Sequence, residues 1–241
     1  MKKYFNINNV RLVLIFILVL FLYSFTSNRN SHRKLKGSEV LFVGEKTNFL
    51  KQETVNKLLI ENRTDVKTIE KYEVILKKLE KDINNNPMIA SSEVFISVDG
   101  VLKTIVIQKT PIARFFNEQG SFYIDIQGNT MPLSEEETAR VPLVLGNINA
   151  KNKVNLIALL KQIYEDDFLK KNITSLQILS NQSVIMTTRN FDYQILFGQL
   201  INIESKFKNY KAFYQKAVEG NLLEKYKTIN LIFEHQVVAT K

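Results

Sequence analysis

The sequence predicts an α+β protein in which a single N-terminal transmembrane helix precedes a folded body of helices and strands. Three observations support this fold class. Residues 12–25 are apolar on every helical face, the hydrophobic period changes from 3.6 to 2 after Pro87, and an alternating strand follows Thr228 near the C-terminus. About 200 residues lie beyond the apolar run, enough for one large domain or two modest ones.

The apolar run is expected to anchor the chain in a membrane, because a helix without a polar face must be buried on all sides. Residues 10–27 would give about 27 Å of helix if Arg11 extends its guanidinium to the headgroups. A cleaved signal peptide is the alternative, but residues 24–27 offer no typical cleavage site. We therefore expect a retained helix over residues 12–27. Its anchoring residues are Leu12, Ile15, Phe16, Leu20 and Tyr23.

The formal net charge of +9 is concentrated beside this anchor. The first 38 residues hold 7 of the 33 Lys and Arg residues and none of the 24 acidic residues, which leaves 26 basic against 24 acidic residues elsewhere. This distribution argues against nucleic-acid binding and indicates a solvated basic collar or contact with anionic lipid headgroups. Basic residues flank the anchor on both sides, so charge does not choose an orientation. We expect the short tail, residues 1–11, to be cytoplasmic.

After a basic linker, residues 28–38, the chain has the order strand, helix, helix, strand, strand. The last two strands flank Asp99-Gly100, and such a dipeptide between alternating strands is the strongest short-range signal for a β-hairpin. Asn48 is expected to cap the first helix. The expected elements are a strand at 39–44, helices at 49–61 and 69–83, and strands at 94–98 and 101–107.

The remaining residues predict a largely antiparallel sheet with two helices. An Asp125 followed by Gln127-Gly128 reads as a turn in which Gly takes positive φ. Asp166 is expected at a helix end, and Gly220-Asn221 is a C-cap signal. The expected elements are helices at 152–168 and 200–217 and strands at 175–180, 183–188 and 193–197.

The last predicted strand carries the functional hypothesis. From Thr228 to Thr240 one face is apolar except for His235 and the other is largely polar, which is typical of a half-buried antiparallel strand of about twelve residues. A terminal strand often lies at a sheet edge and offers unpaired N–H and C=O groups to another chain, so we expect β-augmentation by an extended partner. A strand already paired within its own sheet is the alternative. The expected partner-binding residues are Tyr226, Thr228, Asn230, Leu231, Ile232, Phe233 and Glu234.

The stretch between the two groups of elements carries a family resemblance. The residues concerned are Gln108, Pro111, Ala113, Arg114, Tyr123, Asp125 and Gly128. Together with residues 141–146 and the ending 226–241, their order and spacing resemble the FtsQ/DivIB family of bacterial cell-division proteins, in the form found in Bacteroidetes-type bacteria. The domain junction in this family is marked by the positions that correspond to Gln108, Pro111, Arg114, Asp125 and Gly128.

The resemblance implies that the body consists of a POTRA domain (β-α-α-β-β), residues 39–110, and a C-terminal β domain, residues 111–241. It implies a single-pass inner-membrane scaffold with a cytoplasmic N-terminus and a periplasmic body, located at the division septum. The expected partners are division proteins resembling FtsB (DivIC) and FtsL, the lipid bilayer, and other divisome components that would contact the POTRA domain. A POTRA-containing export or membrane-assembly factor is the alternative.

No residue pattern predicts an enzyme. The chain has no Cys, which excludes disulfides, zinc–thiolate sites and a thiol nucleophile. It also lacks a Gly-rich phosphate loop, a paired-His motif and a Ser nucleophile elbow. The two histidines are isolated: His32 lies in the linker and His235 in the last strand. We therefore expect no catalytic, metal or cofactor site, no nucleic-acid partner and no small-molecule substrate.

Overall fold

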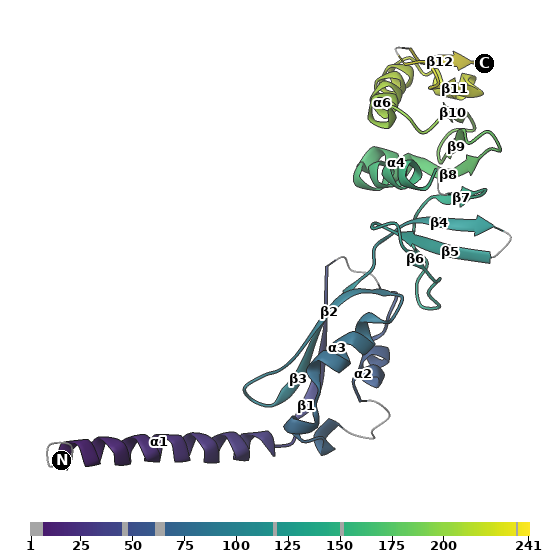
Figure 1. Cartoon of the computed structure of the whole chain (residues 1–241). Coiled ribbons are helices and arrows are strands. Elements are labelled where there is room, and N and C mark those ends of the chain that lie inside the picture. The colour runs from purple at the N-terminus through teal and green to yellow at the C-terminus, as the bar shows by residue number, and fades with distance from the viewer. Residues whose placement is uncertain (1–6, 45–47, 61–65, 118–119, 150–151, 235) are drawn as a thin grey trace. The chain divides into compact units, whose positions relative to one another are not determined.

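The computed structural model describes residues 7–44, 48–60, 66–117, 120–149, 152–234 and 236–241. Its elements are labelled in Figure 1. The chain forms two compact units, which meet between Gln108 and Lys109 in the sequence, although Asn48 and Phe49 belong to the second unit. Both units combine helices with strands, so the predicted α+β fold class is confirmed.

An apolar helix, α1 (Ile7–Ser31), begins the described chain (Figure 1). None of its residues is buried. Its 25 residues correspond to about 37 Å of helix. Within the described residues, α1 is the one helix long and apolar enough to cross a membrane, with a mean hydropathy of 2.3. All five predicted anchoring residues lie on it and are exposed. The first six residues of the predicted cytoplasmic tail lie outside the described residues.

The first unit continues with three strands and two helices in the predicted β-α-α-β-β order. They are β1 (Gly37–Val43), α2 (Gln52–Ile60), α3 (Leu76–Asn84), β2 (Ile89–Ile96) and β3 (Val101–Gln108). The sheet order is β1-β3-β2, with β1 parallel and β2 antiparallel to β3. Helices α2 and α3 cover one face of this sheet (Figure 1) and bury Val55, Leu59, Leu79 and Ile83.

The predicted helix over residues 69–83 is wrong in its first half. Two 3-10 turns, η1 (Val66–Thr68) and η2 (Lys71–Glu73), precede α3. The backbone here bonds to the linker instead of to its own helical turn, because the Leu35 amide donates to the Ile69 carbonyl and the Lys71 amide donates to the Arg33 carbonyl, both at 2.9 Å. Tertiary pairing therefore overrides the helical period in this segment.

The predicted helix over residues 49–61 also begins later than expected, at Gln52. Asn48 is therefore not its cap. Phe49, the first residue of the predicted helix, is buried in the second unit. Its carbonyl accepts a hydrogen bond from the Ser134 hydroxyl at 2.9 Å. Phe49 therefore packs within the second unit and does not join α2.

The β2–β3 hairpin has a longer turn than the predicted two-residue loop. The Gly100 amide donates to the Ser97 carbonyl at 2.9 Å, and the Ser97 amide donates to the Val101 carbonyl at 2.9 Å. Gly100 has a φ of +94°, which favours glycine at this position. Val98 consequently lies at the tip of the turn, fully exposed, and does not continue the buried face of β2.

The second unit is built on one sheet of nine strands in the order β12-β11-β10-β9-β8-β7-β4-β5-β6. The pairs β11–β10, β8–β7 and β7–β4 are parallel and the other five are antiparallel. The strands are β4 (Pro111–Asn117), β5 (Gly120–Asp125), β6 (Thr130–Met131), β7 (Leu143–Leu145), β8 (Ile173–Ile178), β9 (Val184–Thr188), β10 (Gln194–Gly198), β11 (Thr228–Asn230) and β12 (Val238–Thr240). The predicted three-strand meander corresponds to β8, β9 and β10.

Two longer helices, α4 (Lys153–Glu165) and α6 (Ile203–Glu219), pack on this sheet (Figure 1). The predicted helix over residues 152–168 is interrupted at Asp166, whose carboxylate accepts hydrogen bonds from the Phe168 and Leu169 amides and thereby starts a separate helix, α5 (Asp167–Asn172). A last 3-10 turn, η3 (Leu223–Lys225), leads to β11. The fully buried residues of the shared core include Leu160, Ile163, Val144, Leu176, Met186, Ile195, Phe207, Tyr210 and Ile229.

Candidate functional site

The predicted terminal strand over residues 228–240 is not continuous. It consists of β11 and β12, which pair with each other in antiparallel register, Thr228 opposite Thr240 and Asn230 opposite Val238. The break has a local cause, because the Asn230 side-chain oxygen accepts a hydrogen bond from the Ile232 amide at 2.9 Å. Such a contact satisfies a backbone group outside the ladder and turns the chain.

Strand β11 has neighbours on both sides, so Thr228 and Asn230 do not form an open edge. On one side, the Gln194 amide donates to the Lys227 carbonyl and the Leu231 amide donates to the Leu196 carbonyl, both at 2.9 Å. On the other side lies β12. The expectation that these backbone groups await a partner is therefore wrong, because the chain's own last residues occupy that position. The outermost strand at this end of the sheet is β12.

The register defines which backbone groups of β12 face outward. The Lys227 carbonyl and the Leu231 amide bond to β10, and Ile229 between them faces the same way, so Thr228 and Asn230 face β12. Their partners Thr240 and Val238 point back toward β11. The Lys227 amide also faces β12, because it donates to the Thr240 carbonyl at 2.8 Å. Backbone groups alternate along a strand, which leaves the N–H and C=O of Ala239 on the outer side of β12. Ala239 is thus the residue through which an added strand would pair with this edge.

The segment between β11 and β12 is hydrogen-bonded to α6 and to Asn202, the residue that precedes this helix. The Asn202 side chain donates to the Glu234 carboxylate at 3.3 Å, and the Asn209 side chain donates to the Glu234 carbonyl at 3.1 Å. Leu231 is buried, whereas Ile232 and Phe233 are 55% and 48% exposed. These two apolar side chains lie beside the edge strand in sequence and are open to solvent. His235 lies outside the described residues.

The positions of Ile232 and Tyr226 are set by close packing. A Cβ atom added to Gly198, which has a φ of +74°, would lie 2.8 Å from Ile232 Cγ1, so glycine at the end of β10 makes room for this side chain. The Tyr226 ring lies 5.7 Å from the Phe213 ring and is half-buried against α6. Tyr226 therefore supports the edge from within the unit.

A buried cation, Lys206, fixes the loop on which this segment rests. Its ammonium group donates hydrogen bonds to the Phe197 and Gln199 carbonyls, each at 2.8 Å, and lies 4.6 Å from the centre of the Phe197 ring. The side chain is almost fully buried, and this burial lowers the pKa of Lys206. An ammonium that binds two carbonyls at the end of β10 holds the turn into α6 in place.

Four of the five predicted junction residues lie at the beginning of the second unit's sheet. Pro111 starts β4 and pairs in register with Asp125 at the end of β5. The Asp125 carboxylate is buried and accepts hydrogen bonds from the Gln127 and Asn129 amides at 2.9 and 2.8 Å, so its role is the predicted turn chemistry. Gly128 in this turn has a φ of +86°.

The other two junction residues are also structural. The Arg114 side chain donates to the Ser121 hydroxyl at 2.8 Å, across the β4–β5 pair. Gln108 is the last residue of β3 in the first unit and is nearly buried. Arg114 therefore holds two strands of the second unit's sheet together, whereas Gln108 ends the sheet of the first unit.

The described residues contain no group of three or more His, Asp or Glu side chains that could hold a metal ion. A buried polar cluster joins Asn172, Tyr210 and Tyr193, with the Tyr210 hydroxyl 2.7 Å from the Asn172 amide nitrogen and 2.8 Å from the Tyr193 hydroxyl. Burial raises the pKa of both tyrosines, so both remain protonated at neutral pH. The cluster lies within the core and has the character of a structural network.

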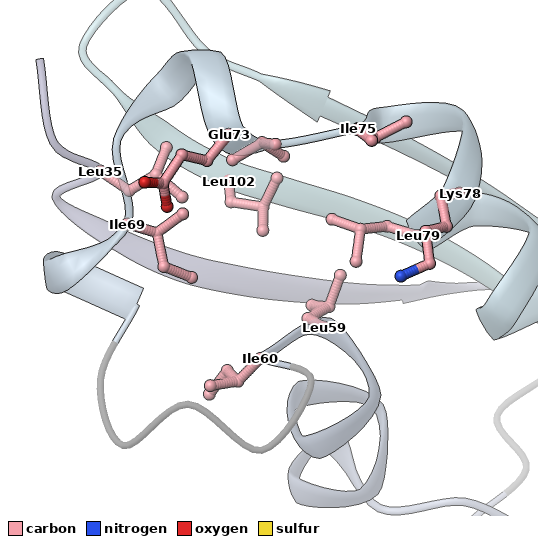
Figure 2. A pocket seen from close by; sticks show the side chains of 10 residues that line it. Leu35, Leu59, Ile60, Ile69, Glu73, Ile75, Lys78, Leu79 and Leu102 are labelled. Carbon is pink, nitrogen blue, oxygen red and sulfur yellow. The ribbon is translucent and has the colours of Figure 1, made fainter. Parts of the chain in front are cut away.

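A small pocket in the first unit is equally unsuited to catalysis. It has a volume of about 80 Å³ and lies between η2, α3 and the sheet. Figure 2 shows mainly aliphatic side chains around it, among them Leu35, Ile69 and Leu102, with Glu73 and Lys78 as the charged residues. Its lining is mostly apolar and its volume admits only a few atoms.

Two features of the edge were missed by sequence reasoning. The outward-facing backbone of Ala239 could not be assigned because alternation alone does not show where a strand breaks. The buried Lys206 was missed because a single Lys on an amphipathic helix usually faces solvent. Lys206 directly precedes the buried Phe207 on α6, but this position in the sequence does not distinguish it from the exposed residues around it.

Comparisons with known proteins identify the family. The model of the family described as FtsQ/DivIB, C-terminal related, matches residues 110–240. No curated protein matches this chain. Among solved structures, the chain is similar to the major extracytoplasmic domain of the trans isomer of the bacterial cell division protein DivIB from Geobacillus stearothermophilus, with 12% sequence identity and a TM-score of 0.30 over 47% of this chain and 96% of that one. Because the family match covers more than half of its residues, this chain belongs to the FtsQ/DivIB C-terminal related family.

Proposed function

We propose that this protein is a bitopic scaffold of the bacterial cell-division machinery, which links divisome components through contacts of its extracytoplasmic units. Membership of the FtsQ/DivIB family carries the cell-division role, and this family is one of non-catalytic division proteins. The apolar helix α1 supports a single-pass membrane protein. In the proposed arrangement the N-terminus is cytoplasmic, and the two units lie in the periplasm at the septum of the inner membrane. The protein has no enzymatic activity in this proposal.

The proposed mode of partner binding is strand addition at β12. This strand is the outermost one at its end of the sheet and directs the backbone of Ala239 outward. An extended segment of a division protein resembling FtsB (DivIC) or FtsL would pair there and contact the exposed Ile232 and Phe233. Unpaired backbone at an edge gives affinity, and the neighbouring apolar side chains give specificity. Further divisome components would bind the POTRA-like first unit.

Localisation tests the proposed role. A fluorescent fusion at the N-terminus of the full chain is expected to form a band at mid-cell in dividing cells. A matched fusion in which residues 1–31 are retained and the two folded units are removed should stain the envelope evenly, because the proposed contacts lie beyond α1. Even staining by the full-length fusion, at a level that restores growth of a depleted strain, would contradict the divisome role.

A further inference from the structure

The basic linker that follows α1 is built into the first folded unit. Leu35 is 2% exposed, and its amide donates to the Ile69 carbonyl at 2.9 Å. On either side of it, the Arg33 carbonyl accepts from the Lys71 amide and the Lys36 amide donates to the Gly100 carbonyl, again at 2.9 Å. These bonds join the linker to η2 and to the turn of the β2–β3 hairpin.

The joined segments form a basic surface. We define it by the side chains of Arg33, Lys34, Lys36 and Lys71, with the exposed Val98 at the tip of the hairpin turn. Lys36 and Lys71 both flank the turn, since a Cβ atom on Gly100 would lie 3.8 and 3.5 Å from their side-chain carbons. The exposed Tyr72 adjoins this surface, with its ring 5.1 Å from that of His32.

Acidic groups on the same segments do not neutralise the surface. Glu70 lies 3.0 Å from His32 Nδ1, and Asp99 stands in the hairpin turn beside the basic residues. Glu73 lines the small apolar pocket. Against these three acids stand the four cations of the surface, and Arg29 in the last turn of α1 adds a fifth. The net charge of this end of the unit is therefore positive.

The covalent connection to α1 brings the basic surface to the bilayer. At 1.5 Å per residue, Ser31 lies about 9 Å beyond Phe25, the last residue of the apolar run, and two further residues to Arg33 span at most about 7 Å. The headgroup layer is about 5–8 Å thick on each side, and charges act over a Debye length of about 8 Å at physiological salt. Arg33 is therefore within electrostatic range of the headgroups. Lys71 and Lys36 lie close to it, because the Lys71 amide donates to the Arg33 carbonyl and the Lys36 amide donates to the Gly100 carbonyl in the adjacent turn.

We propose that the basic surface docks on anionic phospholipid headgroups and that Val98 enters the interfacial layer, so that the first unit rests on the membrane. Anionic headgroups are the expected binding partner because the surface is positively charged and because it is joined directly to the membrane helix α1. Each Lys or Arg near an anionic bilayer contributes about fivefold to binding. Three of the four cations would together favour the docked state by about a hundredfold.

The absence of Cys from the sequence allows a clean test with the full-length chain in vesicles. An environment-sensitive fluorophore on Val98→Cys is expected to shift to the blue in mixed phosphatidylcholine and phosphatidylglycerol and to remain in water in phosphatidylcholine alone. The control label is placed on Ser91→Cys, an exposed position of β2 at least about 16 Å along the strand from the turn, and it should not respond to lipid composition.

A charge variant separates docking from general proximity. The triple variant Arg33→Gln, Lys36→Gln, Lys71→Gln should abolish the lipid-dependent shift at Val98→Cys. A matched variant that removes three exposed lysines of α2 and α3, Lys57→Gln, Lys77→Gln, Lys81→Gln, should retain it. The proposal is overturned if the label gives the same spectrum in both lipid mixtures, if the label at Ser91→Cys shifts equally, or if the two triple variants behave alike.

Discussion

Replacement of Ala239 by Pro is the sharpest perturbation of the proposed edge. Pro removes the one N–H of β12 that faces away from β11, and it leaves the ladder bonds of Val238 and Thr240 in place. Pro is tolerated in an edge strand when its nitrogen faces solvent, and the preceding residue, Val238, already has the extended conformation that Pro favours. The free protein should therefore fold normally.

The expected loss of partner affinity can be estimated from the missing bond. A backbone hydrogen bond contributes about 0.5–1.5 kcal/mol net, and the partner carbonyl left without a donor costs a further 1–3 kcal/mol or so. Together these terms predict binding that is roughly tenfold to a thousandfold weaker. The neighbouring contacts of Ile232 and Phe233 would remain, so binding should be weakened and not uniformly abolished.

The assay is isothermal titration calorimetry. The full-length chain, solubilised in detergent, is titrated with the extracytoplasmic segment of the FtsB-like protein. Ala239→Val is the matched control, because it keeps the N–H group and adds bulk that suits a strand. Circular dichroism and thermal unfolding establish that both variants fold. Leu231→Pro is unsuitable, because the Leu231 amide already donates to the Leu196 carbonyl at 2.9 Å.

The outcome distinguishes strand addition from other modes of binding. If folded Ala239→Pro binds as tightly as Ala239→Val, the partner does not pair with β12 and the edge-strand reasoning fails. If both variants lose binding equally, the side chain at this position matters and the backbone does not. Loss confined to Ala239→Pro is the result that strand addition requires.

Two further predictions concern the residues that support the fold around the edge. Lys206→Met should destabilise the second unit by about 2–4 kcal/mol, because the Phe197 and Gln199 carbonyls lose their donor. Burial lowers the pKa of Lys206 below 10.5, so at alkaline pH the unfolded state binds more protons than the folded state. The free energy of unfolding of the wild type should therefore rise as the pH increases from the lowered pKa toward 10.5. Urea titrations of Lys206→Met should not show this rise. Asp166→Ala should cost about 1–2 kcal/mol, measured in the same way, through loss of the α5 cap and of the Lys211 contact at 2.5 Å. Burial raises the pKa of Asp166, but hydrogen bonds from Lys211 and from the Leu169 and Phe168 amides outweigh burial and lower the pKa below 3.8. The stability that Asp166 contributes is therefore fully present above pH 3.8 and is lost as the pH falls through the lowered pKa. Equal acid sensitivity of Asp166→Ala and the wild type would contradict this prediction.

Elements with strong local signals could be predicted from the sequence. The β2–β3 hairpin follows from Asp99-Gly100 between alternating strands, and α6 follows from its apolar stripe and the Gly220-Asn221 ending. Asn221 has a φ of +50°, as expected after a helix C-terminus. These signals act within a few residues, so they do not depend on what the segment meets elsewhere in the fold.

Elements decided by distant partners could not be predicted in the same way. The stripe from Ile69 to Ile83 fits one helix, but the backbone of Ile69 and Lys71 bonds to residues more than thirty positions earlier in the sequence. Ile69, Leu79 and Ile83 are all buried as the stripe predicts, whereas Tyr72 is exposed. Periodicity identified most of the buried side chains and misjudged the backbone between them.

The terminal strand shows why the edge was anticipated at the C-terminus but assigned to the wrong residues. The alternation of apolar and polar residues correctly predicts that Ile229 and Leu231 are buried. The same alternation continues to Ala239, so it does not reveal the turn that the Asn230 side chain stabilises. The turn shortens the exposed edge to the three residues of β12, and short edges resist unselective pairing with other chains. An edge of three residues offers few backbone bonds, so a selective partner needs additional contacts. The exposed Ile232 and Phe233 are the apolar side chains closest in sequence to the turn that creates this edge, which is why strand addition at Ala239 and side-chain contact at these two residues are expected to act together.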